Sequence, residues 1–197
     1  MEIIDLNSDI EKKISLVQNE EKFFVWLLGS GGNFDGNFVF DLDAEARLTN
    51  IFLFSANDAD DFRVNISVRH LGENSFSNTF IYGLGCGAAK SSVLAKARID
   101  KGAKHSSAWI EGRALLFGDS QCRIDPLLEV ETSEVERAGH AAAVSKVSDE
   151  ELFYMASRGV AKLEAEKLKS EGFLFSPLLK SGVGFKEARE IVKSLII

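Results

Sequence analysis

Side chains able to bind a metal are few in this chain and are scattered along the sequence. The thiols are Cys86 and Cys122, which show no C-x-x-C spacing, and the imidazoles are His70, His105 and His140. Thiolates and neutral imidazoles are common metal ligands. The competing role for both cysteines is that of a small, half-buried apolar residue. For His140 it is a structural hydrogen bond, and for His70 and His105, in or beside predicted turns, it is a surface or stacking role.

Carboxylates are grouped in two places. An acidic run at 129–136 precedes His140, and Asp58, Asp60 and Asp61 form a denser knot. The acidic run is explained by a solvent-exposed face, although its carboxylates could also help to hold ferrous iron. The three aspartates are explained by a turn. The sequence has no G-x-x-x-x-G-K-[ST] phosphate loop, no G-x-S-x-G elbow and no H-E-x-x-H zinc motif. We therefore expect a protein that does not hydrolyse ATP itself and is not an enzyme.

Charge and hydropathy exclude several classes of partner. The net charge of the 197-residue chain is −7 and its pI is about 5.1, whereas nucleic acids and anionic membranes attract basic surfaces. The longest apolar run, Phe23–Leu28, is much shorter than the roughly 20 residues of a spanning helix. The first residues are acidic and unlike a signal peptide. Two thiols without such a signal predict a reduced, cytoplasmic protein.

Short strands dominate the pattern between about residues 23 and 130. Apolar residues alternate clearly at Phe38, Phe40 and Leu42, as expected for strands with one buried face. The many Phe and few Pro suit stacked strands whose turns are made by Gly, Asn and Asp. The predicted strands are Phe23–Leu28, Asn37–Leu42, Thr49–Phe54, Arg63–Arg69, Asn78–Tyr82, Ser92–Ile99, Ser107–Ile110 and Ala114–Phe117.

Two all-β folds compete for these strands. Strand starts recur every ~13–15 residues without helical pattern between them, which is typical of a repeat architecture. A β-sandwich usually has tight hairpin dipeptides, and Asp35-Gly36 is the only one of that kind here. A parallel β-helix needs small residues at its corners, which the segment Gly83–Ala89 supplies. Periodicity alone favours the β-helix only slightly over the sandwich.

The end of the chain is helical. Ser148 and Glu151 form a capping box that starts a helix, and Gly159 suits its left-handed end. A second helix is predicted through Leu163 to Gly172, because Pro177 marks a break.

A third helix is predicted from about Phe185, and a short one at Ser8–Val17, where Ile10, Ile14 and Val17 share one face. These patterns divide the chain into an N-terminal segment (1–22), a β-helix core (23–135) and a C-terminal helical region (146–197).

A longer pattern extends over the second half of the sequence. HAAAV at 140–144 is followed by DEELFYMASRG at 149–159, EAEKL at 164–168 and GF at 172–173, and IDPLLEV at 124–130 precedes them. Less marked similarities lie at 68–77 and 102–104. These segments resemble the SufB/SufD family, the scaffold proteins of Suf-type iron–sulfur cluster assembly. The resemblance covers roughly residues 60–175, and a run of this length is far more specific than one short motif.

The resemblance implies both a fold and a role. The family fold is a right-handed parallel β-helix, a single-stranded solenoid, with a C-terminal α-helical segment. Family members pair through the ends of their β-helices, and each binds the ABC-type ATPase SufC through its helical region. ATP-driven dimerisation of SufC then changes the interface where the cluster is built. The chain is therefore expected to be a SufD-like scaffold that pairs with itself or with a SufB-like subunit.

Site residues follow from the same resemblance. SufD proteins carry a histidine at the position of His140, at the subunit interface, so His140 is the candidate interface and metal residue. Cys122 and Cys86 are the other cluster candidates. Because a cluster usually takes four thiolates, an iron–sulfur cluster here would be transient and shared with a partner subunit. The ATPase-docking candidates are Leu152, Phe153, Tyr154, Arg158, Leu163 and Phe173.

Departures from the family pattern leave alternatives open. Gly112 stands where SufB proteins have their key cysteine, which makes the chain more SufD-like, and Cys122 could substitute for that cysteine. Typical family chains are also considerably longer. An adaptor or regulator of an ABC-type ATPase that never binds iron is the alternative function. A β-helix enzyme acting on carbohydrate is a third, but the sequence lacks the clustered acids and the export signal usual for that class.

Overall fold

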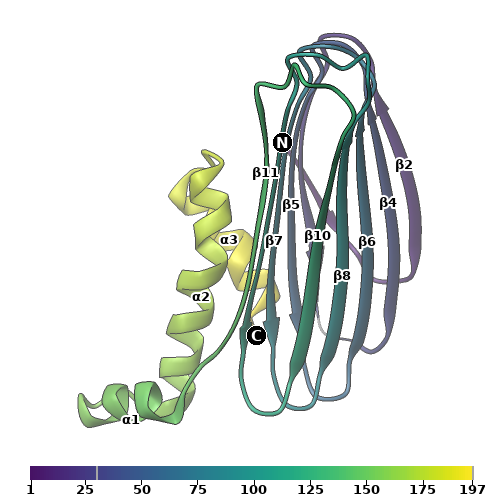
Figure 1. Cartoon of the computed structure of the whole chain (residues 1–197). Helices are drawn as coiled ribbons and strands as arrows, with labels where there is room; N and C mark the ends of the chain where they lie inside the picture. The colour runs from purple at the N-terminus through teal and green to yellow at the C-terminus, as the bar shows by residue number, and fades with distance from the viewer. Residues whose placement is uncertain (30, 197) are drawn as a thin grey trace.

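The chain folds into a parallel β-solenoid of about five turns followed by three helices (Figure 1). The computed structural model describes residues 1–29 and 31–196. One sheet, here called sheet A, contains β1 (Glu2–Asp5), β3 (Glu21–Leu28), β5 (Arg47–Ala56), β7 (Phe76–Gly85), β9 (Ser107–Leu116) and β11 (Arg137–Lys146) in that order. Sheet B contains β2 (Ile10–Leu16), β4 (Phe34–Leu42), β6 (Asp61–His70), β8 (Lys90–Ile99) and β10 (Gln121–Val130).

Every strand pair in both sheets is parallel, and the chain passes alternately through sheet A and sheet B. A sandwich of antiparallel hairpins would give the opposite pairing. The parallel β-helix expected from the sequence is therefore confirmed, and the sandwich is excluded. The segment 1–22 contributes β1 and β2 to the solenoid, and the last strand of the solenoid ends at Lys146.

The space between the two sheets is filled by inward-facing apolar side chains. Aromatic residues dominate the first turns: Trp26 stacks on Phe52 with ring centroids 5.6 Å apart, and Phe38 meets both rings edge-on at 5.0 Å. Later turns use smaller residues such as Ala95 and Ala97. The alternation read from the sequence thus places its phenylalanines in the interior, where they pack at aromatic-pair distances.

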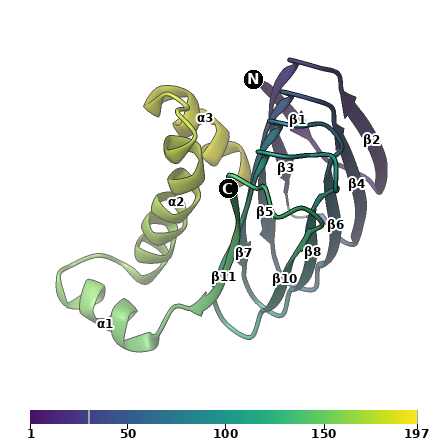
Figure 2. The ribbon, with the colours of Figure 1, turned by 45° about the horizontal axis from the view of Figure 1, so that its top comes forward.

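Helices α2 (Lys162–Lys180) and α3 (Phe185–Leu195) cover the outer face of sheet A, and α1 (Asp149–Ser157) packs against one end of α2 (Figure 2). Leu174 and Leu178 of α2 and Ile191 and Val192 of α3 are buried in one cluster with outward-facing residues of β3, β5 and β7. The outer face of sheet B instead carries cross-strand ion pairs, such as Lys13–Asp41 at 3.0 Å and Arg69–Asp100 at 2.6 Å. No helix among the described residues is long and apolar enough to cross a membrane.

Two helix predictions fare differently. The capping box is present, because Ser148 and Glu151 exchange hydrogen bonds with each other's backbone at 3.2 Å, and Gly159 takes the left-handed conformation with φ +86°. The break at Pro177 is wrong, since α2 continues through Gly172 and Pro177 to Lys180. A proline inside a helix loses one backbone hydrogen bond. Burial of the α2 face against sheet A offsets that cost.

The predicted helix at 8–17 is also wrong, because Ile10–Leu16 is the strand β2. Ile10 and Ile14 are four residues apart, a spacing that lies on one face of a helix and also on one face of a strand. In β2 they pack against the solenoid core together with Leu16. The hydrogen-bonded pairing of this segment with β4 shows that it is a strand and not a helix.

Strands β10 and β11 were not predicted. Pro126 argues against a central strand, but β10 is the last strand of sheet B and pairs only with β8. A proline is tolerated on such an edge strand because the side without a partner needs no donor. Strand β11 consists largely of small residues, which have little strand preference of their own.

Candidate functional site

The last turn of the solenoid, formed by β10 and β11, ends in strand edges that pair with no other described residue. His140 lies on β11, opposite Ile110 of β9 in the parallel register. Ile110 faces the solenoid interior, and register partners project from the same face of a sheet. His140 therefore projects toward the interior side of the last turn, and it is exposed because no further turn covers it.

The space beside Gly112 is occupied by a side chain of the neighbouring sheet. A Cβ atom at Gly112 would lie 2.5 Å from Cγ2 of Ile124 on β10. Ile124 is buried and belongs to the interior core. The missing side chain of Gly112 thus gives room to Ile124, and a cysteine there would require Ile124 to move.

The two cysteines lie in different apolar clusters. Cys122 on β10 packs against the core between the sheets, whereas Cys86, just after β7, packs in the cluster between sheet A and the helices. Burial raises the pKa of both thiols, and at Cys86 the carboxylates of Glu166 and Asp58 raise it further. A protonated thiol is a poor metal ligand. Within the described part of the chain, no three His, Cys, Asp or Glu residues lie where they could hold a metal ion, so His140, Cys122 and Cys86 do not converge.

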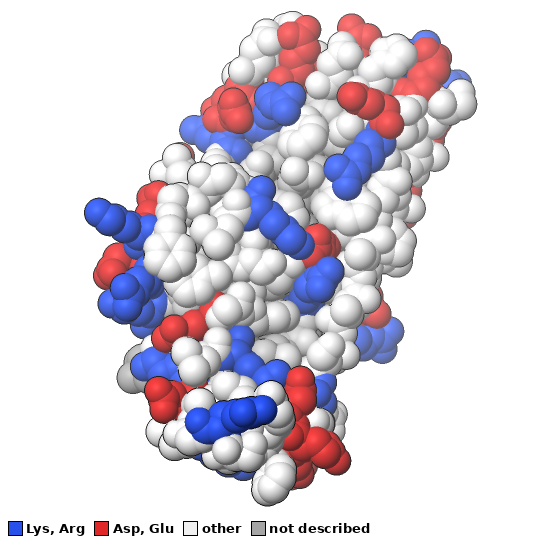
Figure 3. Space-filling view, turned by 90° about the vertical axis from the view of Figure 1, so that its left-hand side faces the viewer, with Lys and Arg blue, Asp and Glu red and all other residues white. Residues whose placement is uncertain are grey.

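The docking candidates divide into exposed and buried residues. Phe153 is 75% exposed and Leu163 is 80% exposed, and both lie on the helices with the exposed Tyr154. The guanidinium of Arg158 lies 5.3 Å from the centre of the Tyr154 ring. Leu152 and Phe173 instead pack into the cluster between helices and sheet A. On this side of the molecule, charges of both signs are mixed with uncharged areas (Figure 3).

A buried polar cluster that the sequence analysis missed joins the helices to sheet A. Glu111 of β9 points outward beneath α2 and accepts hydrogen bonds from the Tyr82 hydroxyl, from Nε of Arg113 at 2.8 Å and from Nζ of Lys180 at 3.0 Å. Burial alone would raise the pKa of Glu111, but its hydrogen bonds and the charges of Lys180 and Arg113 together hold it below its ordinary value. The charged pair Glu111 and Arg113 inside the otherwise apolar segment 108–116 is the signal that could have revealed this cluster.

Replacing Glu111 with alanine should lower the free energy of unfolding by about 2 kcal/mol. Removing one partner of a buried ion pair costs about 3–5 kcal/mol, but Lys180 and Arg113 are 46% and 48% exposed, so solvent screens part of the loss. Urea unfolding of both proteins measures the difference. The control is Glu129→Ala on sheet B, whose 2.8 Å pair with Lys96 is exposed and should leave stability unchanged. Equal effects of the two substitutions would contradict the prediction.

The similarity of this chain to known proteins lies in the solenoid and the first two helices. The profile of the SufBD core domain of SUF-system FeS cluster assembly matches residues 29–173. An iron–sulfur cluster assembly SufBD family protein of Mycobacterium leprae is 35% identical over 113 residues, which are 56% of this chain and 13% of that protein. The iron–sulfur cluster assembly protein SufD of Bacillus subtilis is 34% identical over 106 residues, 53% of this chain and 24% of SufD. The aligned region thus spans less than a quarter of these relatives. The profile covers most of the present sequence, and the chain belongs to the SufBD core domain family.

Proposed function

We propose that the chain is a non-catalytic scaffold subunit of cytoplasmic iron–sulfur cluster assembly, with the cluster as its transient cargo. The observation that carries the proposal is the open last turn of the solenoid, where His140 projects from β11 beside strand edges without described partners. Unpaired strand edges are ready to pair with another chain. Membership of the SufBD core domain family supports the same role.

The open end has the composition of an interface. Leu127 and Val130 of β10 and Val144 of β11 are exposed there, and apolar residues beside free backbone donors and acceptors favour pairing. A second copy of this chain or a SufB-like subunit would bury them and would supply the thiolates that this chain does not bring together. His140 would then lie inside the interface, where an imidazole can bind iron.

The helices supply the second surface. Phe153, Tyr154 and Leu163 are large, apolar and exposed on α1 and the start of α2, and clustered exposed apolar residues mark protein interaction sites. We assign this surface to a SufC-like ABC-type ATPase. No phosphate loop occurs in the chain, so the ATP-driven step belongs to the partner.

Val144→Asp should weaken the pairing of two scaffold subunits at least tenfold. The substitution places an unpaired charge in the apolar part of the proposed interface, which costs more than about 1.4 kcal/mol when it is desolvated. Sedimentation equilibrium of the purified chain, alone or with a SufB-like subunit, measures the dissociation constant. Val17→Asp is the matched control, because Val17 is also exposed but lies in the turn after β2. Unchanged pairing in Val144→Asp would exclude this end as the interface.

The scaffold role is tested by co-expression with the host's SufC-like ATPase. Anaerobic size-exclusion chromatography with light scattering gives the composition of each complex, and iron and sulfide are assayed in each peak. A complex of two scaffold subunits with the ATPase, carrying iron and sulfide, is the expected result. A monomer that does not bind the ATPase and carries no iron would overturn the proposal.

An adaptor that binds the ATPase but never binds iron is the second candidate function. The separation of Cys86 from Cys122 by sheet A and the filling of the Gly112 position by Ile124 favour it. His140→Ala separates the two candidates. A scaffold loses bound iron and sulfide in this variant while ATPase binding persists, whereas an adaptor shows no change in either.

A further inference from the structure

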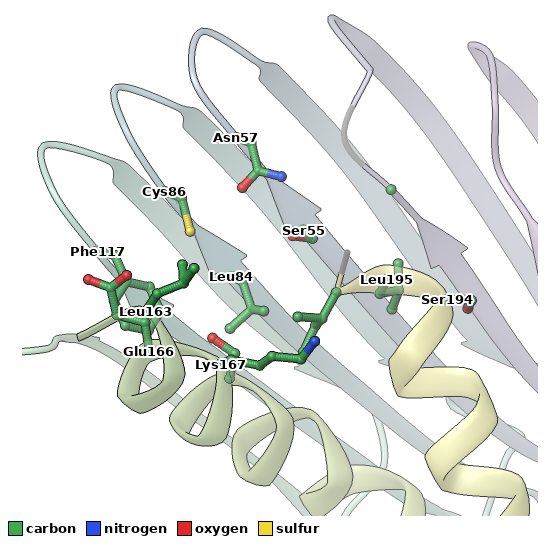
Figure 4. A pocket seen from close by; sticks show the side chains of 13 residues that line it. Ser55, Asn57, Leu84, Cys86, Phe117, Leu163, Glu166, Lys167, Ser194 and Leu195 are labelled. Atoms are coloured by element: carbon green, nitrogen blue, oxygen red, sulfur yellow. The ribbon is translucent and has the colours of Figure 1, made fainter. Parts of the chain in front are cut away.

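A cleft of about 530 Å³ lies between the C-terminal helices and the ends of strands β5, β7 and β9 (Figure 4). It lies on the helical side of sheet A, whereas His140 lies on the last turn of the solenoid. Its volume is in the range of sites for small molecules, about 300–1,000 Å³. The described residues that line it are Gly29, Ser55, Asn57, Leu84, Cys86, Phe117, Leu163, Glu166, Lys167, Ser170, Ser194, Leu195 and Ile196.

The walls of the cleft are mainly apolar. Leu84 of β7 and Phe117 after β9 form one side, and Leu163 of α2 and Leu195 of α3 form the other. Small-molecule sites are typically lined by apolar side chains with a few polar groups among them. An apolar group of a ligand would bind favourably between these walls, because its surface would be removed from water.

Two serine hydroxyls in the cleft have no protein partner among the described residues. Ser55 of β5 is 5% exposed and Ser170 of α2 is 6% exposed, and neither side chain makes a hydrogen bond to a described residue. The residues are largely buried, but their hydroxyl oxygens are open to solvent, since the fully buried side-chain atoms without a described partner are Asn50 Nδ2, Thr79 Oγ1 and Ser181 Oγ. A polar group of a ligand, or water in its absence, would satisfy both.

The uncompensated charge of the cleft is positive. Lys167 lines it, as Figure 4 shows, and forms no ion pair within the described part of the chain. Its neighbour Glu166 lies 3.9 Å from Lys162, so the negative charge has a partner and the positive charge of Lys167 has none. Burial keeps the thiol of Cys86 protonated by raising its pKa, and the cleft gains no second anion from it.

We propose that this cleft binds a small amphipathic carboxylic acid, with its apolar chain between the leucine walls and its carboxylate toward Lys167. The hydroxyls of Ser55 and Ser170 are the hydrogen-bond donors available to the same ligand. The site is separate from the open end of the solenoid. It does not depend on iron binding, but it shares Leu163 with the surface assigned to the ATPase.

Decanoate binding to the full chain tests the proposal. The dye anilinonaphthalene sulfonate, which is also an apolar anion, is bound first, and decanoate displaces it in a fluorescence titration. Lys167→Gln should weaken decanoate binding about fivefold, as expected for a partly exposed ion pair. Decanol, which has no charge, should bind with the same affinity to both proteins. Lys186→Gln is the control, because Lys186 is exposed on α3 and does not line the cleft.

Ser170→Leu provides an independent test. The leucine fills part of the cleft and removes a hydroxyl without a protein partner, so the fold should be retained. Thermal melting by circular dichroism checks this, and saturable displacement by decanoate should be lost. If Ser170→Leu does not fold, Lys167→Gln decides alone, since Lys167 is exposed. No displacement in the unmodified chain, or equal displacement in all folded variants, would overturn the proposal.

Discussion

Lowering the pH from 7 to 5 should reduce the free energy of unfolding by about 2 kcal/mol, because His70 is buried in its neutral form. The side chain is 0% exposed, and its two ring nitrogens lie 2.7 and 2.8 Å from the hydroxyls of Ser75 and Ser77. This placement corrects the surface or stacking role expected from the sequence. Burial lowers the pKa of His70 from 6.5 to about 4.

The sign follows from proton binding. Between pH 6.5 and 4 the unfolded chain binds a proton at His70 that the folded chain does not, so stability falls as the pH falls. Each pKa unit is worth about 1.4 kcal/mol, which gives about 2 kcal/mol at pH 5 and about 3 kcal/mol at pH 4. Carboxylates such as Asp100 and Glu111, whose pKa values are lowered, lose their contributions only at lower pH.

Urea unfolding at several pH values measures this slope. His70→Gln should be less stable at pH 7 and should lack the loss between pH 7 and 5. His105→Gln is the matched control and should keep the full slope, because His105 lies exposed in a turn with φ +55°. A slope that survives in His70→Gln would assign the acid sensitivity to other groups.

The double substitution Phe153→Ala and Leu163→Ala should weaken binding of a SufC-like ATPase by at least about 30-fold. Large apolar residues at the centre of an interface typically cost 2 kcal/mol or more when they are truncated. Both side chains are largely exposed, so their removal should leave the stability of the chain unchanged. Isothermal titration with the purified ATPase measures the affinity, and urea unfolding checks the fold.

Two controls make this result specific. Leu94→Ala removes a leucine that is 41% exposed on sheet B and should leave the affinity unchanged. Leu152→Ala removes a buried α1 residue, so it should lower stability by about 2–5 kcal/mol as a core truncation. Unchanged affinity in the double variant would place the ATPase on another surface.

The sequence predicts the fold where local signals and packing agree. Phe38 and Phe40 alternate because one face of β4 is buried, and Ser148 caps a helix through its own side chain. The strand at Ile10–Leu16 could not be separated from a helix by spacing, because four residues return to the same face in both structures. Likewise, Pro177 predicts a helix break from the local sequence alone. The helix continues because its apolar face packs against sheet A, a contact that exists only in the folded chain.

The candidate site was harder to predict because it depends on contacts between distant residues. The family resemblance pointed to His140, but its position on a terminal strand follows from how many turns the solenoid has. Cys86 lies just after β7 and Cys122 lies on β10 of the next turn, yet their side chains lie on opposite sides of sheet A. Glu111 and Lys180 meet only because α2 folds back over β9.

The stacking of one turn on the next leaves the length of this fold open. Successive strands of sheet A are offset along the chain by similar lengths, as in the pairs Arg47 with Phe76 and Phe76 with Ser107. Each strand contacts mainly the strands directly before and after it in its sheet. A stack of this kind has no fixed size. Whole turns can therefore be added or removed while the remaining turns keep their packing against one another.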